Sequence, residues 1–145
     1  TDGLNIFGGY STIAQFKDAA GNYSGDRTQF GFGATYAVGA VTMGYQYTKD
    51  NRAANEGTNY YENDAYGISF AINDDLTISY AKQKSTRYFN NSNSNVELDG
   101  DSLQLSYSFG GASIKIAEAS VDNKNYLTTA ANQRDGRTIA LTLAF

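Results

Sequence analysis

The chain has 145 residues, among them 12 Tyr, 8 Phe, 15 Gly and 14 Asn, and it contains no Pro, Cys, His or Trp. Without His or Cys, the composition excludes Ser-His-Asp and Cys-His catalytic groups, the usual zinc sites, iron–sulfur clusters and disulfides. The formal net charge of −4 argues against nucleic acid as a partner, because phosphate binding requires a basic face.

Apolar and polar residues alternate along most of the chain, and this period of two predicts β-strands rather than helices. No strongly apolar run exceeds about three residues, whereas a transmembrane helix needs ~20 and a transmembrane strand only ~9–11. In chain order, the predicted strands cover residues 4–16, 27–38, 41–48, 65–72, 76–83, 103–109, 112–117 and 138–145.

The predicted connections alternate in length, so that residues 1–145 form one meander. Short turns of Gly, Asn or Asp are expected at 38–40, 73–75 and 110–111. Long hydrophilic loops are expected at 17–26, 49–63, 86–100 and 122–136. A similar strand–turn–strand pattern recurs every 36–37 residues, starting at Phe30, Tyr66 and Leu103. Short turns at one end and long loops at the other are typical of up-and-down transmembrane β-barrels.

The two faces of the predicted strands differ in side-chain size. One face is bulky and apolar, whereas the other consists mainly of Gly, Ala, Ser, Thr, Asn and Gln. A face in bulk water usually carries many charges, so this pattern favours a barrel with its bulky face in lipid and its small face around a lumen. The larger side chains predicted to line the lumen are Arg27, Gln29, Gln46, Gln83, Gln104 and Lys115.

Two of these lumen residues are charged. Arg27 and Lys115 are expected to favour anions, unless each extends to a rim or pairs with a loop carboxylate.

Aromatic residues gather toward both ends of the predicted strands, with Leu, Ile and Val between them. This distribution is typical of the aromatic girdles at the two membrane interfaces. The girdle residues are Phe16, Tyr36, Tyr45, Tyr47, Tyr66, Phe70, Tyr80, Tyr107 and Phe109.

Two pairs of carboxylates are the candidates for acid–base or metal chemistry. Asp74 and Asp75 fall in a predicted turn, where Asp is expected for backbone reasons. Asp99 and Asp101 lack the spacing of an EF-hand loop, which favours a solvated loop over a calcium site. We therefore expect no catalytic activity, no metal and no cofactor.

Several segments resemble the general porins of Gram-negative bacteria, particularly the alphaproteobacterial type. They are SYSFGGASIKIAEASVDNKNY, the final RTIALTLAF and the internal YGISFAINDDLTISYAK. The resemblance implies an outer-membrane β-barrel for passive diffusion of small hydrophilic solutes and ions, forming a homotrimer in contact with lipid and lipopolysaccharide. It also implies a C-terminal signal read by the outer-membrane insertion machinery, formed by Ile139, Leu141, Leu143 and Phe145.

The chain departs from the 16-stranded porin pattern in three respects. Only eight strands are predicted, no loop is long enough to be the constriction loop, and no arginine cluster facing acidic residues is expected on the small face. These departures favour the C-terminal half of a porin, as does Thr1-Asp2-Gly3, which resembles the end of a tight turn. A complete, closed eight-stranded barrel with a structural or adhesive role is the alternative, followed by a soluble ligand-binding barrel.

Overall fold

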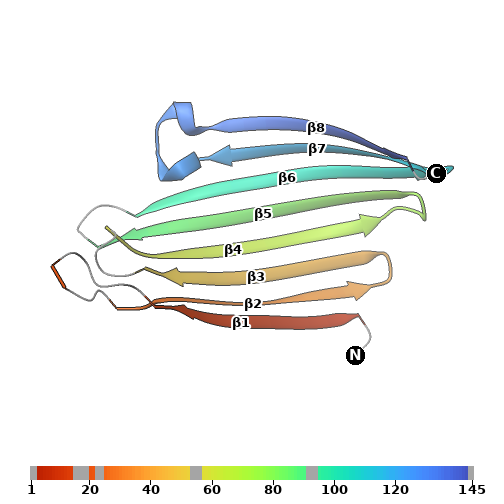
Figure 1. Cartoon of the computed structure of the whole chain (residues 1–145). Coiled ribbons are helices and arrows are strands. Elements are labelled where there is room, and N and C mark those ends of the chain that lie inside the picture. Colours follow the sequence, from red (N-terminus) through yellow and green to blue (C-terminus); the bar gives the residue numbers. More distant parts are fainter. Residues whose placement is uncertain (1–2, 15–19, 22–24, 53–56, 91–94, 144–145) are drawn as a thin grey trace.

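The computed structural model of the chain is a single antiparallel sheet in which eight strands follow one another in sequence order (Figure 1). It describes residues 3–14, 20–21, 25–52, 57–90 and 95–143. The strands are β1 (Leu4–Ile13), β2 (Arg27–Val38), β3 (Val41–Asn51), β4 (Thr58–Ala71), β5 (Leu76–Phe89), β6 (Val96–Phe109), β7 (Ala112–Asp122) and β8 (Arg134–Leu143). The predicted all-β, up-and-down antiparallel architecture is therefore confirmed.

The sheet is open, with β1 and β8 at its two edges. Among the described residues, β1 pairs only with β2, and β8 pairs only with β7. The closed eight-stranded barrel considered from the sequence is thus not the arrangement found. A barrel of eight strands has an interior that side chains fill, whereas many residues on the polar face of this sheet are Gly, Ala or Ser.

The strands β3 to β8 extend further toward the long connections than hydropathy indicated, whereas β2 has its predicted bounds. β1 ends at Ile13, and residues 15 and 16 of its predicted range lie outside the described residues. β4 begins at Thr58 and β6 at Val96, well before the predicted starts at residues 65 and 103. In the added part of β4 neither face is consistently apolar. In the added part of β6, Val96 and Leu98 lie on the face that is polar elsewhere, so the alternation of hydropathy is reversed although the backbone pairing continues. The connection from β7 to β8 contains two short 3-10 turns, η1 (Lys124–Tyr126) and η2 (Ala130–Asn132).

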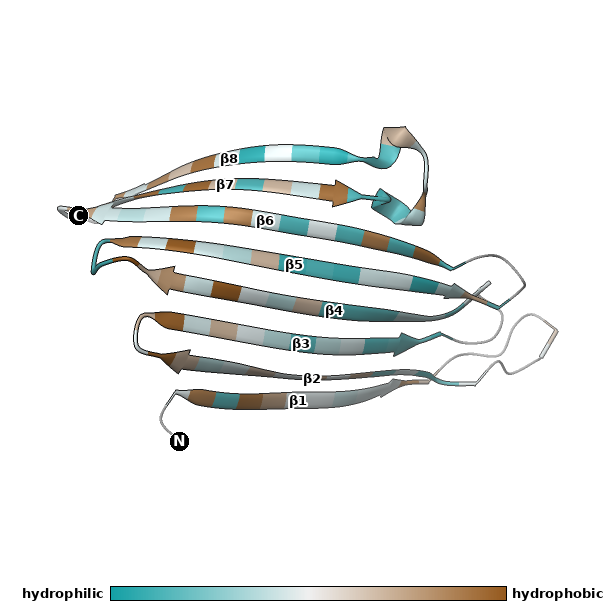
Figure 2. Cartoon of the chain, turned by 180° about the vertical axis from the view of Figure 1, so that it is seen from behind, coloured by the Kyte–Doolittle hydropathy of each residue, from teal (hydrophilic) through white to brown (hydrophobic). Residues whose placement is uncertain are grey.

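The two ends of the sheet differ in their connections and their hydropathy. We call the end with the tight turns after β2, β4 and β6 the turn end, and the opposite end the loop end. In Figure 2, most hydrophobic residues lie toward the turn end and hydrophilic residues dominate the loop end. Within the described part of the chain, no helix is long and apolar enough to cross a membrane.

The described residues contain no conventional hydrophobic core. None of their side chains is fully buried, and Thr58 and Ser85 are the most buried polar residues, at 3% and 4% exposure. Large apolar side chains are widely exposed, among them Ile6 at 73% and Ile139 at 69%. Since soluble domains pack such side chains between two layers, this one-layer sheet needs an apolar environment on one face.

Phe7 is an exception to the alternation in β1, because it lies on the polar face opposite Gly33 of β2. A Cβ atom added at Gly33 would lie 2.5 Å from Cζ of Phe7 and 2.7 Å from the backbone oxygen of Tyr45. The absence of a side chain at Gly33 therefore makes room for the Phe7 ring.

We predict that Gly33→Ala lowers the free energy of unfolding by about 1–3 kcal/mol, because the added methyl group overpacks this contact. Gly136→Ala is the matched control, since a Cβ at Gly136 of β8 meets no atom within 4 Å. Urea unfolding in detergent micelles, followed by circular dichroism, measures both variants. Equal stability of the two variants would contradict the packing of Phe7 over Gly33.

Candidate functional site

The strand register sorts the side chains onto two faces. Arg27, Gln29, Gln46, Gln83, Gln104 and Lys115, which the sequence predicts to line a lumen, all lie on one face, called here the polar face. Gln46 and Gln83 even share a register row, in which Ala65 lies between them. The sheet therefore brings the predicted lining residues to a common surface.

The opposite face, called here the belt face, carries the apolar side chains in a continuous band. All predicted girdle residues within the described ranges are on it, namely Tyr36, Tyr45, Tyr47, Tyr66, Phe70, Tyr80, Tyr107 and Phe109. Ile139, Leu141 and Leu143 of the predicted C-terminal signal are on the same face of β8. Phe16 and Phe145 lie outside the described residues.

The apolar band runs obliquely across the strands. Its edge toward the loop end follows Tyr10, Phe30, Tyr47, Tyr66, Tyr80, Leu103, Ile116 and Ile139, one residue per strand. Tyr10 and Phe30 are directly paired in the register. The residues paired with Ile139, followed from strand to strand across the sheet, lead instead to Val38 on β2. Val38 lies eight residues along β2 from Phe30. At ~3.3 Å per residue and ~4.8 Å per strand, this offset corresponds to strands tilted by about 40° from the normal to the band.

Beyond the aromatic edge, the belt face becomes ionic. Lys49 lies 2.9 Å from Glu62, and Lys84 lies 2.8 Å from Glu97. Farther across the sheet, Arg137 pairs with Glu118 on the neighbouring strand.

The predicted acidic pair at Asp99 and Asp101 belongs to this ionic region. Asp99 lies 2.9 Å from the Lys82 amine, and Asp101 accepts a hydrogen bond from Ser120 at 2.7 Å. Among the described residues, no group of three or more Asp or Glu side chains is arranged to hold a metal ion.

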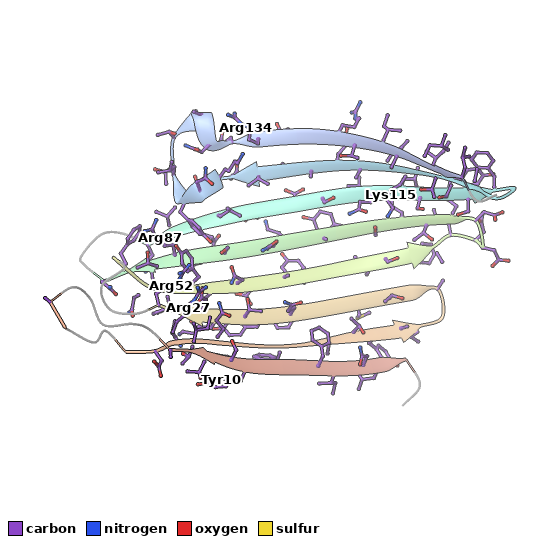
Figure 3. All side chains as sticks on the ribbon, viewed as in Figure 1. Tyr10, Arg27, Arg52, Arg87, Lys115 and Arg134 are labelled. Carbon is purple, nitrogen blue, oxygen red and sulfur yellow. The ribbon has the colours of Figure 1, made fainter. Side chains whose placement is uncertain are left out.

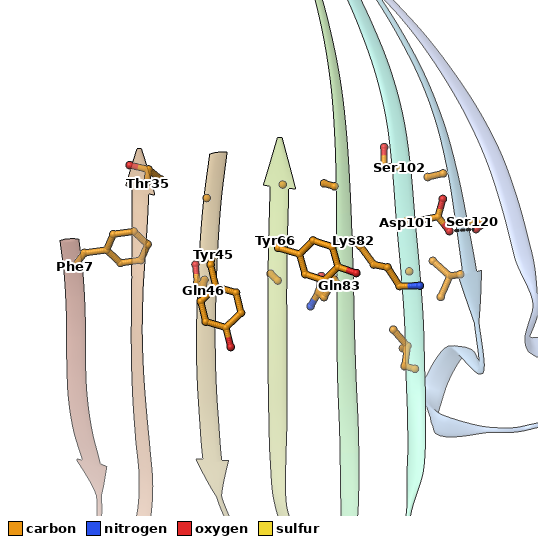
Figure 4. Close-up of a pocket in the computed structure, with 18 residues that line it drawn as sticks. Phe7, Thr35, Tyr45, Gln46, Tyr66, Lys82, Gln83, Asp101, Ser102 and Ser120 are labelled. Carbon is orange, nitrogen blue, oxygen red and sulfur yellow. Dashed lines mark hydrogen bonds between the residues drawn. The ribbon is translucent and has the colours of Figure 1, made fainter. Parts of the chain in front are cut away.

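The polar face is hollowed over its central strands (Figure 4). The hollow extends from Phe7 on β1 to Val121 on β7, with Gln46 and Gln83 along it. Its floor follows a row of small residues, Gly44, Gly67, Ala81, Ser102 and Ala119, which are neighbours on successive strands. Small side chains on adjacent strands leave open space over the sheet.

Arginine side chains gather at the loop end of the polar face (Figure 3). Arg27 donates two hydrogen bonds to the Asp50 carboxylate, from Nε at 2.7 Å and from Nη2 at 2.5 Å. Nε of Arg52 lies 3.3 Å from the same carboxylate, and its guanidinium lies 5.5 Å from the centre of the Tyr61 ring. We call Arg27, Asp50, Arg52 and Arg87 the arginine cluster.

The cluster corrects the sequence-based expectation that no arginines face an acidic residue on this surface. Arg52 and Arg87 fall in ranges that hydropathy assigned to loops, so their faces could not be read from the alternation. Extending the period of two from β3 and β5 places Asp50 and Arg87 on the polar face. The sequence alternation could therefore have predicted the face of these two residues, but only if the strands were known to continue beyond the apolar segments.

Burial and nearby charges have opposite effects on Asp50, which lies beyond the aromatic edge of the band on β3. Its partial burial raises the carboxyl pKa, but the hydrogen bonds and positive charge of Arg27 and the charge of Arg52 outweigh burial and leave the pKa below its usual value. The ionised pair therefore contributes stability above the ordinary carboxyl pKa and loses it as the pH falls through the lowered value.

The polar face is cationic overall. Within the described strands, Asp50 is the only acidic side chain that the register places on it, whereas Arg27, Arg87, Lys115 and Arg134 are basic. Arg87 donates to Thr58 Oγ1 at 2.9 Å and lies over the Phe89 ring, and no carboxylate of the described chain pairs with it. Lys115 likewise has no carboxylate partner among the described residues and lies nearer the turn end.

Comparisons with known proteins identify no family for this chain. No model of a known protein family matches the chain, and no curated protein matches its sequence.

We predict that Asp50→Asn lowers the free energy of unfolding by about 1–3 kcal/mol, because it weakens the charge-assisted hydrogen bonds of Arg27 and leaves two guanidinium groups without their shared carboxylate. Asp75→Asn, in the exposed turn after β4, is the control. Urea unfolding in detergent measures the difference, and equal midpoints for the two variants would argue against a structural role of the cluster.

Proposed function

We propose that this chain forms part of the wall of a water-filled pore in the bacterial outer membrane, through which small hydrophilic solutes and ions diffuse passively. The observation that carries the proposal is the oblique apolar band, whose loop-end edge is aromatic from β1 to β5, on the opposite face from a hollowed polar surface. A transmembrane barrel requires these two unlike faces, because its strands contact lipid outside and water inside. The proposal includes no chemical step, metal or cofactor.

The tilt of the strands supports a membrane location. The angle of about 40° derived from the apolar band lies within the ~35–45° of transmembrane barrel strands. The ionic pairs beyond the band also agree with strands that continue past the lipid into the headgroup region and water. There they would face the charged headgroups of outer-membrane lipid and lipopolysaccharide.

Closure of the pore requires strand partners at both edges of the open sheet. We propose that β1 and β8 pair with further strands of a wider, 16-stranded wall, as in the general porins that the sequence resembles. A wide wall agrees with the small residues on the polar face, because a wide lumen does not have to be filled by side chains. On the same resemblance we expect a homotrimer and recognition of β8 by the outer-membrane insertion machinery.

A water-exposed cationic surface favours anionic solutes, because lining charge contributes to pore selectivity. Arg87 and Lys115 carry most weight here, since Arg27 and Arg52 share the Asp50 carboxylate. The proposed pore therefore prefers small anions over cations of similar size.

The absence of Trp from the chain permits a direct test of which face contacts lipid. Ile68 and Ser69 are neighbours on β4, with Ile68 in the apolar band and Ser69 on the polar face. We predict that acyl chains carrying bromine strongly quench the fluorescence of Ile68→Trp in vesicles, whereas water-soluble iodide preferentially quenches that of Ser69→Trp. Bromine quenching of neither variant would contradict a lipid-facing band and favour a soluble barrel.

The solute preference can be tested with the full native polypeptide in planar bilayers under a salt gradient. We predict that Lys115→Gln shifts the reversal potential toward lower anion selectivity, because it removes one charge from the lumen. Lys82→Gln is the matched control, since Lys82 lies on the belt face beside Asp99. Absence of conductance in the unmodified protein would overturn the pore, whereas equal shifts for both variants would overturn only the proposed selectivity.

A further inference from the structure

Two glutamine side chains in the hollow of the polar face are free to bind another molecule. Gln46 on β3 and Gln83 on β5 are exposed, and both line the hollow (Figure 4). Neither amide forms a hydrogen bond with any described residue. Gln104 differs in this respect, since its amide donates to Ser102 Oγ at 3.4 Å. The donors and acceptors of Gln46 and Gln83 are therefore available to water or to a solute.

Large and small residues alternate along the register row that contains these two amides. From β1 to β7, the row consists of Phe7, Gly33, Gln46, Ala65, Gln83, Gly100 and Val121. Each small residue lies between two larger side chains, so a slot forms above it. The Phe7 ring fills the slot at Gly33, where an added Cβ would lie 2.5 Å from Cζ of the ring. The slot at Ala65, which has an amide on each side and lines the hollow, is called here the amide slot.

The amide slot has an apolar floor and polar sides. Gln46 and Gln83 are separated by two strand spacings, which places their Cα atoms about 10 Å apart. The floor consists of the Ala65 methyl group together with Gly67 and Ala81 of the adjoining row. Among the described residues, the side chains that line the hollow from the polar face include no charged group. The slot is therefore suited to an uncharged molecule.

The features of the amide slot match the chemistry of a sugar ring. A pyranose has C–H groups on its two faces and hydroxyl groups around its rim, and each hydroxyl both donates and accepts hydrogen bonds. A side-chain amide also donates and accepts, so Gln46 and Gln83 can bind hydroxyl groups on opposite sides of one ring. The C–H groups of the ring then lie on the apolar floor, in the usual combination of apolar lining and a few polar contacts.

We propose that the amide slot is a binding site for one ring of a neutral saccharide. This inference rests on the proposed pore function and adds to it a class of solute that the wall holds transiently. Each hydrogen bond to the saccharide replaces one to water, so the net gain in free energy is small. Weak binding suits a pore, because a solute held on the wall must also be released. The site does not depend on the arginine cluster, which lies at the loop end of the polar face.

The test is a titration with maltotriose of the ion conductance of the full native polypeptide in planar bilayers. We expect a saturable decrease in conductance, because a saccharide bound to the wall obstructs part of the lumen. Polyethylene glycol of equal hydrodynamic radius should lower the conductance only in proportion to its concentration, since ether oxygens replace hydroxyl groups along its chain. The polymer thus controls for the volume that any dissolved molecule occupies in the lumen.

Replacement of either amide should weaken the binding of maltotriose. We expect Gln46→Met or Gln83→Met to raise the half-saturating concentration about 3–10-fold, because each variant loses the hydrogen bonds of one amide at nearly constant side-chain length. Gln104→Met is the matched control, since Gln104 lies on the same face but outside the hollow. The same half-saturating concentration in all three variants and in the unmodified protein would overturn the binding site.

A second measurement does not depend on conductance. The chain has no Trp, so Phe7→Trp introduces a single fluorophore beside Gln46 in the hollow. We expect the emission of this variant in detergent micelles to change saturably with maltotriose but not with the polymer. The emission of Ser106→Trp, on the same face outside the hollow, should change with neither.

The outcomes distinguish the saccharide site from the pore. Conductance that responds alike to maltotriose and to the polymer, or an emission of Phe7→Trp that maltotriose leaves unchanged, would overturn the saccharide site alone. A saturable emission change in Phe7→Trp without conductance in the unmodified protein would support the site and overturn the pore.

Discussion

The structure depends on the hydrogen bonding of one continuous antiparallel sheet. Each strand from β2 to β7 is paired on both sides, so the backbone groups of the sheet interior are satisfied without any second layer. A one-layer sheet of this kind leaves both faces free to contact the surroundings. The chemistry of the two faces, rather than a core, therefore determines where such a molecule is stable.

The two faces divide the charged residues unequally. On the belt face, acidic and basic side chains occur beyond the aromatic edge and largely pair across strands, as Lys49 does with Glu62. On the polar face, basic residues predominate and Asp50 is shared by two of them. The net charge of −4 for the whole chain thus gives no indication of the cationic surface, because the acidic residues lie mainly on the other face or in connections.

The turn-end half of the fold could be predicted from the sequence. Its strands place apolar side chains on one face and polar side chains on the other, so apolar and polar residues alternate along the chain. The predicted bounds of β2, Arg27–Val38, agree with the structure at both ends. The loop-end halves of β4, β5 and β6 could not be predicted in this way. In β4 and β5 neither face is consistently apolar there, and in β6 Val96 and Leu98 lie on the face that is polar in the rest of the strand. Cross-strand pairing and ion pairs support these segments, and such partners are unknown before the register is known.

Only part of the candidate site could be predicted from the alternation of apolar and polar residues. The positions of Gln46, Gln83 and Lys115 follow from parity within the alternating segments. The contact of Tyr126 with Ser85 does not, because it joins residues 41 positions apart and depends on left-handed backbone angles that the sequence Asn-Lys-Asn-Tyr does not specify. Contacts between a connection and a distant strand arise only when the tertiary structure brings them together.

Side chains of the strands and side chains of the connection after β7 differ in the space above the sheet that they can occupy. The side chain of a strand residue projects from the sheet by at most its own length, and the residues in the row through Gly44, Gly67 and Ala81 have little or no side chain. A side chain that arrives from a connection begins above the sheet, so it can occupy space that no wall residue reaches. Tyr126 contacts the sheet in this way, with its hydroxyl 2.6 Å from Ser85 Oγ and its ring 5.3 Å from that of Tyr61.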